Sequence, residues 1–325
     1  MARLRLLGRM LRVSPLFLVG TIIISFFAAI AILAPILAPP TSSDPYICPY
    51  DGPSTGGPIF YHPPPTLPSS KHPFGTMQGY DLYYGCIWGV RTAFYISILT
   101  TILSLATGLS IGSAAGYLEG IVDEVLMRFT DAFFALPGIL YVLLIVMALP
   151  LRLELNLGLF SLTLSVSSLD RIILALAIIG WPQYARVIRS EIKKVKQQDF
   201  VEAAKAVGCS KLRILGKHIL PNSINPVLSL TFLNMGGVLI AASTISFLEF
   251  GPGVGYAEWG SLMASARSYL IFLPGASQFA WPFFIPGAFL SAFVLGWSLV
   301  GDALTYIIDP AFGRRLNIWG SQGSS

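Results

Sequence analysis

The chain has 325 residues, of which 54% are hydrophobic and only 11% are charged. A soluble domain carries about 25% charged residues, so this composition excludes an ordinary soluble protein. The charges are also clustered, and the uncharged tracts between them are long enough to cross a bilayer, which takes about 20 apolar residues per helix. The net charge of +5 therefore indicates basic loops beside a membrane and argues against a nucleic-acid partner.

The N-terminal part predicts a short basic segment followed by a membrane helix. Residues 1–14 carry four arginines, and we expect a retained first span over 15–38. Its apolar core exceeds the length of about 7–15 residues that a signal peptide uses, and no A-x-A cleavage pattern follows. The proline-rich region 39–87 comes next, and it predicts an extracytoplasmic loop because proline fixes φ and lacks an amide donor. This loop is either a connector or a contact surface for a delivery protein.

Five further spans are expected within 88–310. The second span ends near Leu118 and carries Gly108, Gly112 and Gly116 at intervals of four residues, on one helix face. Such a face lets another helix approach closely. We expect it to pack within the same chain in preference to forming a dimer seam.

The remaining spans are predicted over 132–151, 171–186, 219–248 and 283–301. A kink is expected in the third span at Pro137-Gly138. Arg152 and Glu154 precede a Leu/Ser-rich stretch, 158–169, which is too short and too rich in hydroxyls to span, and we interpret it as an outer loop or interfacial segment. A Gly/Pro-rich outer segment, 250–281, separates the last two spans, and a tail over 311–325 ends the chain.

The distribution of basic residues predicts the orientation. Six spans place both termini on one side, and a cytoplasmic N-terminus puts all but five of the 21 Lys and Arg residues in the cytoplasm. The five exceptions are Lys71, Arg91, Arg152, Arg171 and Arg267. Because basic loops stay in the cytoplasm, we predict an all-α, multi-pass membrane protein with both termini cytoplasmic.

The sequence offers no credible catalytic, cofactor or metal site. It lacks the G-x-x-x-x-G-K-[ST] loop that binds ATP phosphates, and its three cysteines and three histidines form no metal-binding pattern. Asp131 and the pair Asp170-Arg171 lie near span ends, which favours helix caps or structural ion pairs over a proton relay. Cys48 and Cys86 are expected on the same outer side, with free thiols favoured over a disulfide.

The densest charge lies between Arg186 and Lys217, in an inner loop that we place at 190–221. We expect Asp199 to cap an alanine-rich helix, Gly208 to end that helix, and Ser210 to cap a second short one. The pattern therefore predicts a helix–turn–helix at the membrane surface. It would either dock on a partner through its small side chains or rest on lipid head groups.

Several motifs in this chain match a known family. The spacing of Glu202-Ala203-Ala204, Gly208 and Ile219-Leu220-Pro221 resembles the E-A-A…G…I-x-L-P loop of ABC importer permeases, before the penultimate span. The other matching segments are His72-Pro73-Phe74-Gly75-Thr76, Gly116-Tyr117, Met127-Arg128, Trp181-Pro182, Ser246-Phe247-Leu248 and Gly301-Asp302. Together they cover nearly the whole chain and are similar to the C-type permease of dipeptide, oligopeptide and nickel importers. Departures from the family pattern lie on the outer side, at 79–81, 249–251 and 152–169.

The resemblance implies the type I ABC importer permease fold, without an ATPase site or a cofactor. The implied partners are a second homologous permease, two cytoplasmic ATPase subunits that bind the ATP, and an extracytoplasmic binding protein, all at a prokaryotic cell membrane. Glu202 would anchor a coupling helix by hydrogen bonds, Gly208 would form its turn, and Pro221 would set the start of the fifth span.

The cargo and the solute-binding residues are not identified by the sequence. Peptides are the commonest cargo that the resemblance implies, and oligosaccharides or nickel are the alternatives within the family. An ion-coupled secondary transporter is the alternative from another class. It would usually show repeated halves, and we find no internal repeat.

Overall fold

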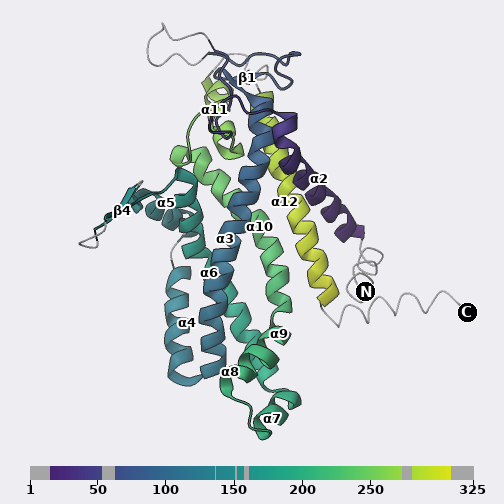
Figure 1. Ribbon diagram of the computed structural model, residues 1–325, viewed down its shortest axis with the longest axis vertical. Coiled ribbons are helices and arrows are strands. Elements are labelled where there is room, and N and C mark those ends of the chain that lie inside the picture. Colours follow the sequence, from purple (N-terminus) through teal and green to yellow (C-terminus); the bar gives the residue numbers. More distant parts are fainter. Residues whose placement is uncertain are drawn as a thin grey trace, which may run out of the picture.

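The computed structural model describes residues 15–52, 63–135, 137–150, 152–156, 161–272 and 280–308. Within these ranges five helices are long and apolar enough to cross a membrane, and a bent helix pair makes six if it counts as one span. The long helices run along the longest axis, with α7 at one end and β1 and α11 at the other (Figure 1). We call these the α7 end and the β1 end. The prediction of a mainly helical membrane protein is confirmed.

The centre of the bundle is the pair α3 (Leu82–Leu118) and α6 (Ser168–Lys196), which have the most extensive contact of any two elements. α3 begins at Leu82 rather than at 88, because the Asp81 carboxylate accepts a hydrogen bond from the Tyr84 amide at 3.1 Å and caps the helix. α6 begins with a capping box between Ser167 and Asp170, which confirms the expected role of Asp170 as a cap.

The three glycines on α3 all face α6. A Cβ on Gly108 would lie 2.5 Å from the Tyr184 Cβ, and one on Gly112 would lie 2.3 Å from the Ala185 carbonyl oxygen. The Gly116 position is also tight, 3.0 Å from a carbonyl oxygen of α6. Only residues without a side chain permit this approach, so the glycine face is used for packing inside the chain.

A second layer consists of α2 (Pro15–Leu37) and α12 (Trp281–Ile308), which lie side by side (Figure 1). Phe27 of α2 is buried and meets Phe293 of α12 edge to face, with ring centroids 5.4 Å apart. Trp259 also packs on both rings, and the aromatic cluster joins this layer to the bundle. The observed α12 is longer at both ends than the predicted span 283–301.

The third predicted span differs most from the structure. Instead of one kinked helix over 132–151, the chain forms α4 (Gly120–Phe134) and α5 (Gly138–Ala148), bent by 90°. Pro137 occupies the N-cap of α5. Because proline has no amide to continue the hydrogen-bond pattern of α4, the break falls there.

Two other segments have structure that the sequence did not predict. The stretch 152–169 contains an antiparallel hairpin of β3 (Arg152–Asn156) and β4 (Ser161–Ser165), paired from Arg152 with Ser165 to Asn156 with Ser161. Within 250–281 the chain forms α11 (Trp259–Phe272). The prediction of an all-α protein is therefore incomplete. The structure contains this hairpin and a second one, formed by β1 (Thr76–Met77) and β2 (Tyr80–Asp81).

The fifth span also starts later than predicted. α10 (Asn225–Ile245) begins after a short α9 (Leu220–Ser223) and continues into a π-helical turn, η2 (Ser246–Phe250). At the β1 end, Cys48 and Cys86 are both buried and both free thiols, as the sequence favoured.

Candidate functional site

The connection between α6 and α10 protrudes at the α7 end of the molecule (Figure 1). It consists of α7 (Asp199–Ala206), α8 (Lys211–Arg213), η1 (Ile214–Ile219) and α9, which is the helix–turn–helix that the sequence predicted. α6 itself runs on to Lys196, so the connection begins there and not at 190. We call residues 197–223 the α6–α10 connection.

The start of α7 corrects one prediction. Gln198, not Asp199, occupies the N-cap position, and it makes no side-chain hydrogen bond there. Asp199 is the first helical residue, and Glu202 lies on the same first turn. Both carboxylates therefore stabilise the helix through its dipole rather than through a cap.

The end of α7 is a tight glycine turn. Gly208 has a φ of +82°, a conformation that other residues adopt at a cost. Its amide donates to the Lys205 carbonyl at 3.0 Å, and the Cys209 amide donates to the Ala204 carbonyl at 3.1 Å. This pair of bonds is a Schellman motif, and it confirms Gly208 as the residue that ends the helix.

The inner face of the connection is packed against the bundle. Val201 of α7 and Ile214 and Ile219 of η1 are buried in one apolar cluster with residues of α6 and α10. The cluster's other buried members are Tyr184, Ile188, Ile192 and Val227. Leu220 also packs against this cluster. Ile219 and Leu220 of the sequence motif therefore contribute to packing and not to an exposed surface.

The outer face of the connection carries the accessible part of the motif. Glu202, Ala203, Gly208 and Pro221 are exposed, and Ala204 is half-buried. The Glu202 carboxylate has no hydrogen-bond partner in the part of the chain that the structure describes. The expected anchoring by Glu202 within this chain is therefore not observed, and its carboxylate is free to meet a partner.

Three exposed apolar side chains on the same face were not singled out in the sequence. They are Phe200, Val207 and Leu212, with exposed fractions of 43%, 84% and 83%. An apolar residue in a strongly charged loop is a signal that could have identified them. Large exposed apolar side chains grouped at one end of a protein indicate a contact surface.

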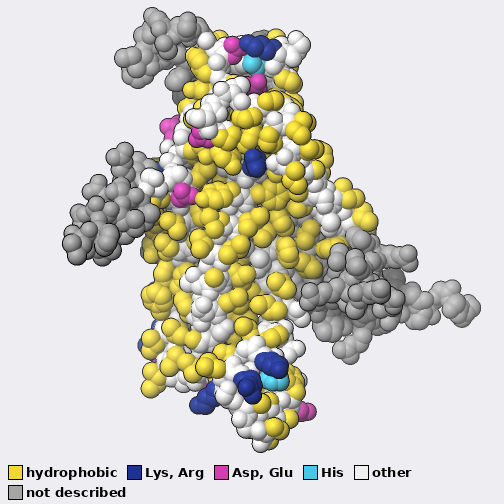
Figure 2. All heavy atoms as spheres, in the orientation of Figure 1, with side chains coloured by type: hydrophobic (Ala, Val, Ile, Leu, Met, Phe, Trp, Pro, Cys, Tyr) yellow, Lys and Arg dark blue, Asp and Glu magenta, His cyan; other side chains and the backbone are white. Residues whose placement is uncertain are grey.

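The basic residues fall into two groups. Arg189, Lys193 and Lys196 lie on α6 and are engaged: the first two bind Asp123 of α4, and the third binds Glu119 at 3.0 Å. Among the described residues, the four cations of the α6–α10 connection form no ion pair, and they are Lys205, Lys211, Arg213 and Lys217. Figure 2 shows basic side chains at this end of the molecule, below a wide apolar band.

The Asp123 contacts hold the C-terminal part of α6, the helix that leads into the α6–α10 connection. The Asp123 carboxylate accepts two hydrogen bonds from Arg189, one of them 2.7 Å long, and one from Lys193 at 2.6 Å. Sequence inspection did not find this cluster, because its acid and its bases lie far apart in the chain. The expected structural pairing of Asp131 is observed, with Arg186 at 2.5 Å.

These features define a class of protein: a helical membrane component whose α6–α10 connection is packed against the bundle on one face and exposed on the other. Residues 108–314 match the family described as the binding-protein-dependent transport system inner membrane component, and residues 3–64 match the N-terminal TM domain of oligopeptide transport permease C. The first match covers more than half of the chain, so the chain belongs to this family. It is a bacterial multi-pass permease component of an ABC transporter and not its ATPase.

Curated relatives agree with this assignment over most of their length. The chain is 30% identical to the oligopeptide transport system permease protein OppC of Bacillus subtilis, over 92% of this chain and 87% of that protein. It is 29% identical to the dipeptide permease DppC of Alkalihalophilus pseudofirmus, over 93% and 88%. It is also 30% identical to the glutathione permease GsiD of Pectobacterium atrosepticum, over 75% and 74%. The family assignment removes the ion-coupled alternative.

Proposed function

We propose that this permease imports short peptides, and that Glu202–Pro221 is the joint at which separate ATPase subunits drive it. The observation that carries the proposal is that the α6–α10 connection has two different faces. Its outer face is exposed and combines apolar and charged side chains, while its inner face is packed on two bundle helices. The names of the relatives, which include oligopeptide, dipeptide and glutathione permeases, support a peptide cargo.

The geometry gives a route for mechanical coupling. Val201, Ile214 and Ile219 pack α7 and η1 directly against α6 and α10. A displacement of α7 is therefore transmitted to both of these spans. α6 passes the displacement to α3 along the close glycine contact. Packed elements of this kind move as rigid bodies, so a partner that changes shape would rock the helices.

The remaining partners and the orientation belong to the same proposal. The α7 end faces the cytoplasm and meets two ATPase subunits, and a second homologous permease completes the pathway across the bilayer. The β1 end faces outward and receives solute from an extracytoplasmic binding protein. Both termini then lie in the cytoplasm, as the distribution of basic residues predicts.

Two substitutions test the joint in the reconstituted importer. Glu202→Lys reverses an exposed charge, and Gly208→Asp places a side chain where φ is +82°. Each is expected to leave membrane insertion intact and to lower solute-stimulated ATP hydrolysis about 5- to 30-fold, the effect of a loss of about 1–2 kcal/mol at the turn or interface. Gly216→Asp is the matched control for Gly208→Asp, because both glycines have open space around them and only Gly208 has a positive φ. Wild-type coupling in both test variants would refute the proposed joint.

A further inference from the structure

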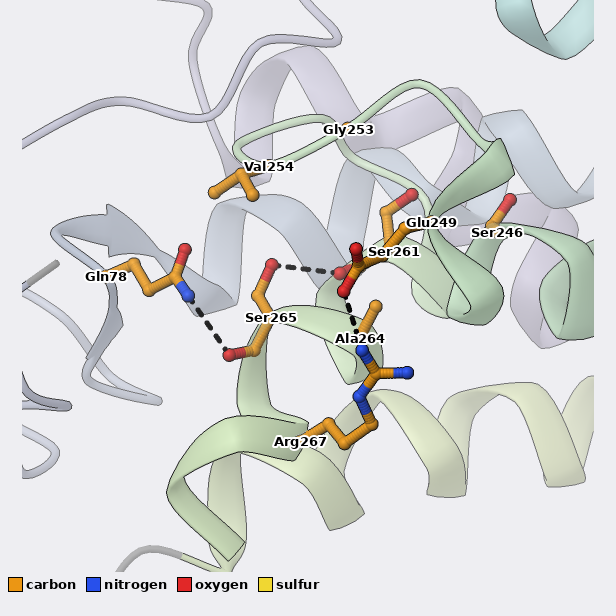
Figure 3. Close-up of a pocket in the computed structure, with 9 residues that line it drawn as sticks. All are labelled: Gln78, Ser246, Glu249, Gly253, Val254, Ser261, Ala264, Ser265 and Arg267. Atoms are coloured by element: carbon orange, nitrogen blue, oxygen red, sulfur yellow. Dashed lines mark hydrogen bonds and ion pairs between the residues drawn. The ribbon is translucent and has the colours of Figure 1, made fainter. Parts of the chain in front are cut away.

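A pocket of about 460 Å³ opens at the β1 end, far from the α6–α10 connection. Its walls come from three places in the sequence: the turn between β1 and β2, η2 with the loop that follows it, and α11 (Figure 3). A volume of this size is within the range of sites that enclose small ligands. The sequence did not identify the residues that bind the solute, and this pocket is a candidate location for them.

Gln78 supplies one wall and an unpaired acceptor. It lies in the two-residue turn between β1 and β2 with a φ of +52°, followed by Gly79 with a φ of +84°, which is the geometry of a type I′ hairpin. Its side-chain amide donates to the Ser265 carbonyl at 3.2 Å. The Gln78 residue is only 7% exposed, and its Oε1 has no hydrogen-bond partner among the described residues.

A buried amide oxygen without a partner is costly, at about 1–3 kcal/mol. The donation from Nε2 to Ser265 fixes the amide, so Oε1 cannot turn away to find another donor. In Figure 3 the Gln78 amide lies across the pocket from Arg267. The pocket therefore holds a positioned acceptor that a ligand N–H would satisfy.

The opposite wall carries one charge of each sign. The Arg267 guanidinium binds the Glu249 carboxylate at 2.6 Å and also lies over the Phe247 ring, 5.4 Å from its centroid. Glu249 has a φ of +71°, an uncommon conformation for a residue with a side chain. Because the two charges cancel, the wall attracts dipolar ligands and gives no advantage to a ligand with net charge.

A buried carboxylate holds the start of α11, the helix that lines one side of the pocket. Glu258 precedes α11 and accepts hydrogen bonds from the amides of Gly260 at 3.0 Å and Ser261 at 2.7 Å. It also accepts one from the Ser243 hydroxyl of α10, at 3.2 Å. This cap fixes the first turn of α11, where Ser261 lines the pocket.

We infer that this pocket binds the backbone of a short, net-neutral peptide, with a peptide N–H donating to Gln78 Oε1. The inference rests on the proposed peptide cargo and specifies where that cargo contacts this chain. A peptide fits the site because it offers donors and acceptors in alternation and a dipolar pair of termini. Val254 and Ala264 line the pocket beside these groups and leave room for small side chains.

The first test measures binding of trialanine to the assembled importer in nanodiscs, without the delivery protein. Gln78→Leu removes the acceptor and is expected to weaken binding about tenfold. Ala264→Phe fills the pocket from α11 and is expected to abolish binding. Gln183→Leu is the matched control, because this glutamine lines a separate hollow formed by α4, α5, α6 and α10. All variants are checked for wild-type basal ATP hydrolysis and unfolding temperature. Equal affinity in the wild type and Gln78→Leu would overturn the inference.

The second test separates a free peptide from a segment of the delivery protein. A photoreactive residue replaces Val254, whose side chain lines the pocket and is 51% exposed. Cross-linking to trialanine in the absence of the delivery protein is expected. Cross-linking to the delivery protein alone would overturn the inference. Import of trialanine by the wild type without binding at the pocket would also overturn it, while leaving the proposed function standing. A failure of peptide import would instead refute the function.

Discussion

The residue His72 connects three parts of the β1 end. Its Nδ1 lies 2.8 Å from a carboxylate oxygen of Asp81, the cap of α3, and its Nε2 lies 3.0 Å from Asp51. Burial lowers the pKa of His72, but the hydrogen bonds and negative charges of Asp51 and Asp81 outweigh burial and raise the pKa above its ordinary value of 6.5. Hydrogen bonds from Lys71 and then His72 lower the pKa of Asp51 below 3.8.

These two shifts predict a pH dependence for the His72 contacts. The raised histidine pKa contributes stability that is complete below 6.5 and is lost as the pH rises through the folded value. The lowered Asp51 pKa contributes stability above 3.8 that is lost as the pH falls. After correction for intrinsic rates, hydrogen exchange around His72 should be slower at about pH 5.5 than at about pH 8.5. His72→Asn should remove the difference, and equal protection of the wild type at both values would contradict it.

Gly112 provides a second test at this scale. Gly112→Ala places a methyl group 2.3 Å from the Ala185 carbonyl oxygen and 2.4 Å from an Ile188 methyl carbon, so α3 and α6 must separate. We expect a loss of about 2 kcal/mol, typical of overpacking, measured by thermal unfolding of the purified protein. Gly237→Ala in α10 is the control, since nothing lies within 4 Å of its added methyl group. A similar loss in both variants would show that the close approach is not the cause.

Among the elements, α4 is joined to α6 by a specific ionic contact. The Asp123 side chain is 10% exposed and binds both Arg189 and Lys193 of α6. Its neighbour Glu124 binds Arg128 within α4, and both of those side chains are largely exposed. The two adjacent acids therefore make a matched pair that differs in burial and in whether the contact joins two elements.

The expected result is a large difference between the two neutralised variants. Asp123→Asn should destabilise the packing of α4 on α6 by about 2 kcal/mol, because a partly buried carboxylate loses bonds to two cations. Glu124→Gln should cost less than about 0.5 kcal/mol, as exposed i,i+4 pairs do. Hydrogen exchange of the α4 amides reports both. Equal effects would mean that the Asp123 contacts do not hold the helix.

The elements also show which predictions a sequence can support. α2 and α12 appear where apolar runs predicted them, because a long uncharged tract has few other conformations available in a bilayer. α11 was missed because its cap, Glu258, is bonded to Ser243 of α10, a contact made only in the folded chain. The break between α4 and α5 was predicted at Pro137, but its 90° angle depends on how α4 packs against α6.

At the scale of the whole molecule, the proposed orientation can be tested with the three native cysteines. Cys209 lies at the α7 end and is partly exposed, whereas Cys48 and Cys86 are buried. Burial also raises the pKa of Cys48 to about 12, which suppresses its reactive thiolate. A membrane-impermeant maleimide should therefore label inside-out vesicles and spare right-side-out ones. Cys209→Ser should abolish the labelling, and labelling of Cys209 from outside would reverse the topology.

The sequence by itself determined the class of protein, the number and order of most spans, and the place of the α6–α10 connection. These follow from local chemistry: apolar tracts long enough for a bilayer, the conformational freedom of Gly208, and the absence of a phosphate-binding loop. Tertiary structure alone decided which side of that connection is buried, since Ile219 and Phe200 differ in environment and not in polarity. It also brought Gln78 to within 3.2 Å of Ser265 and Asp123 to Arg189. Contacts between residues so far apart depend on how the helices pack, which no local pattern encodes.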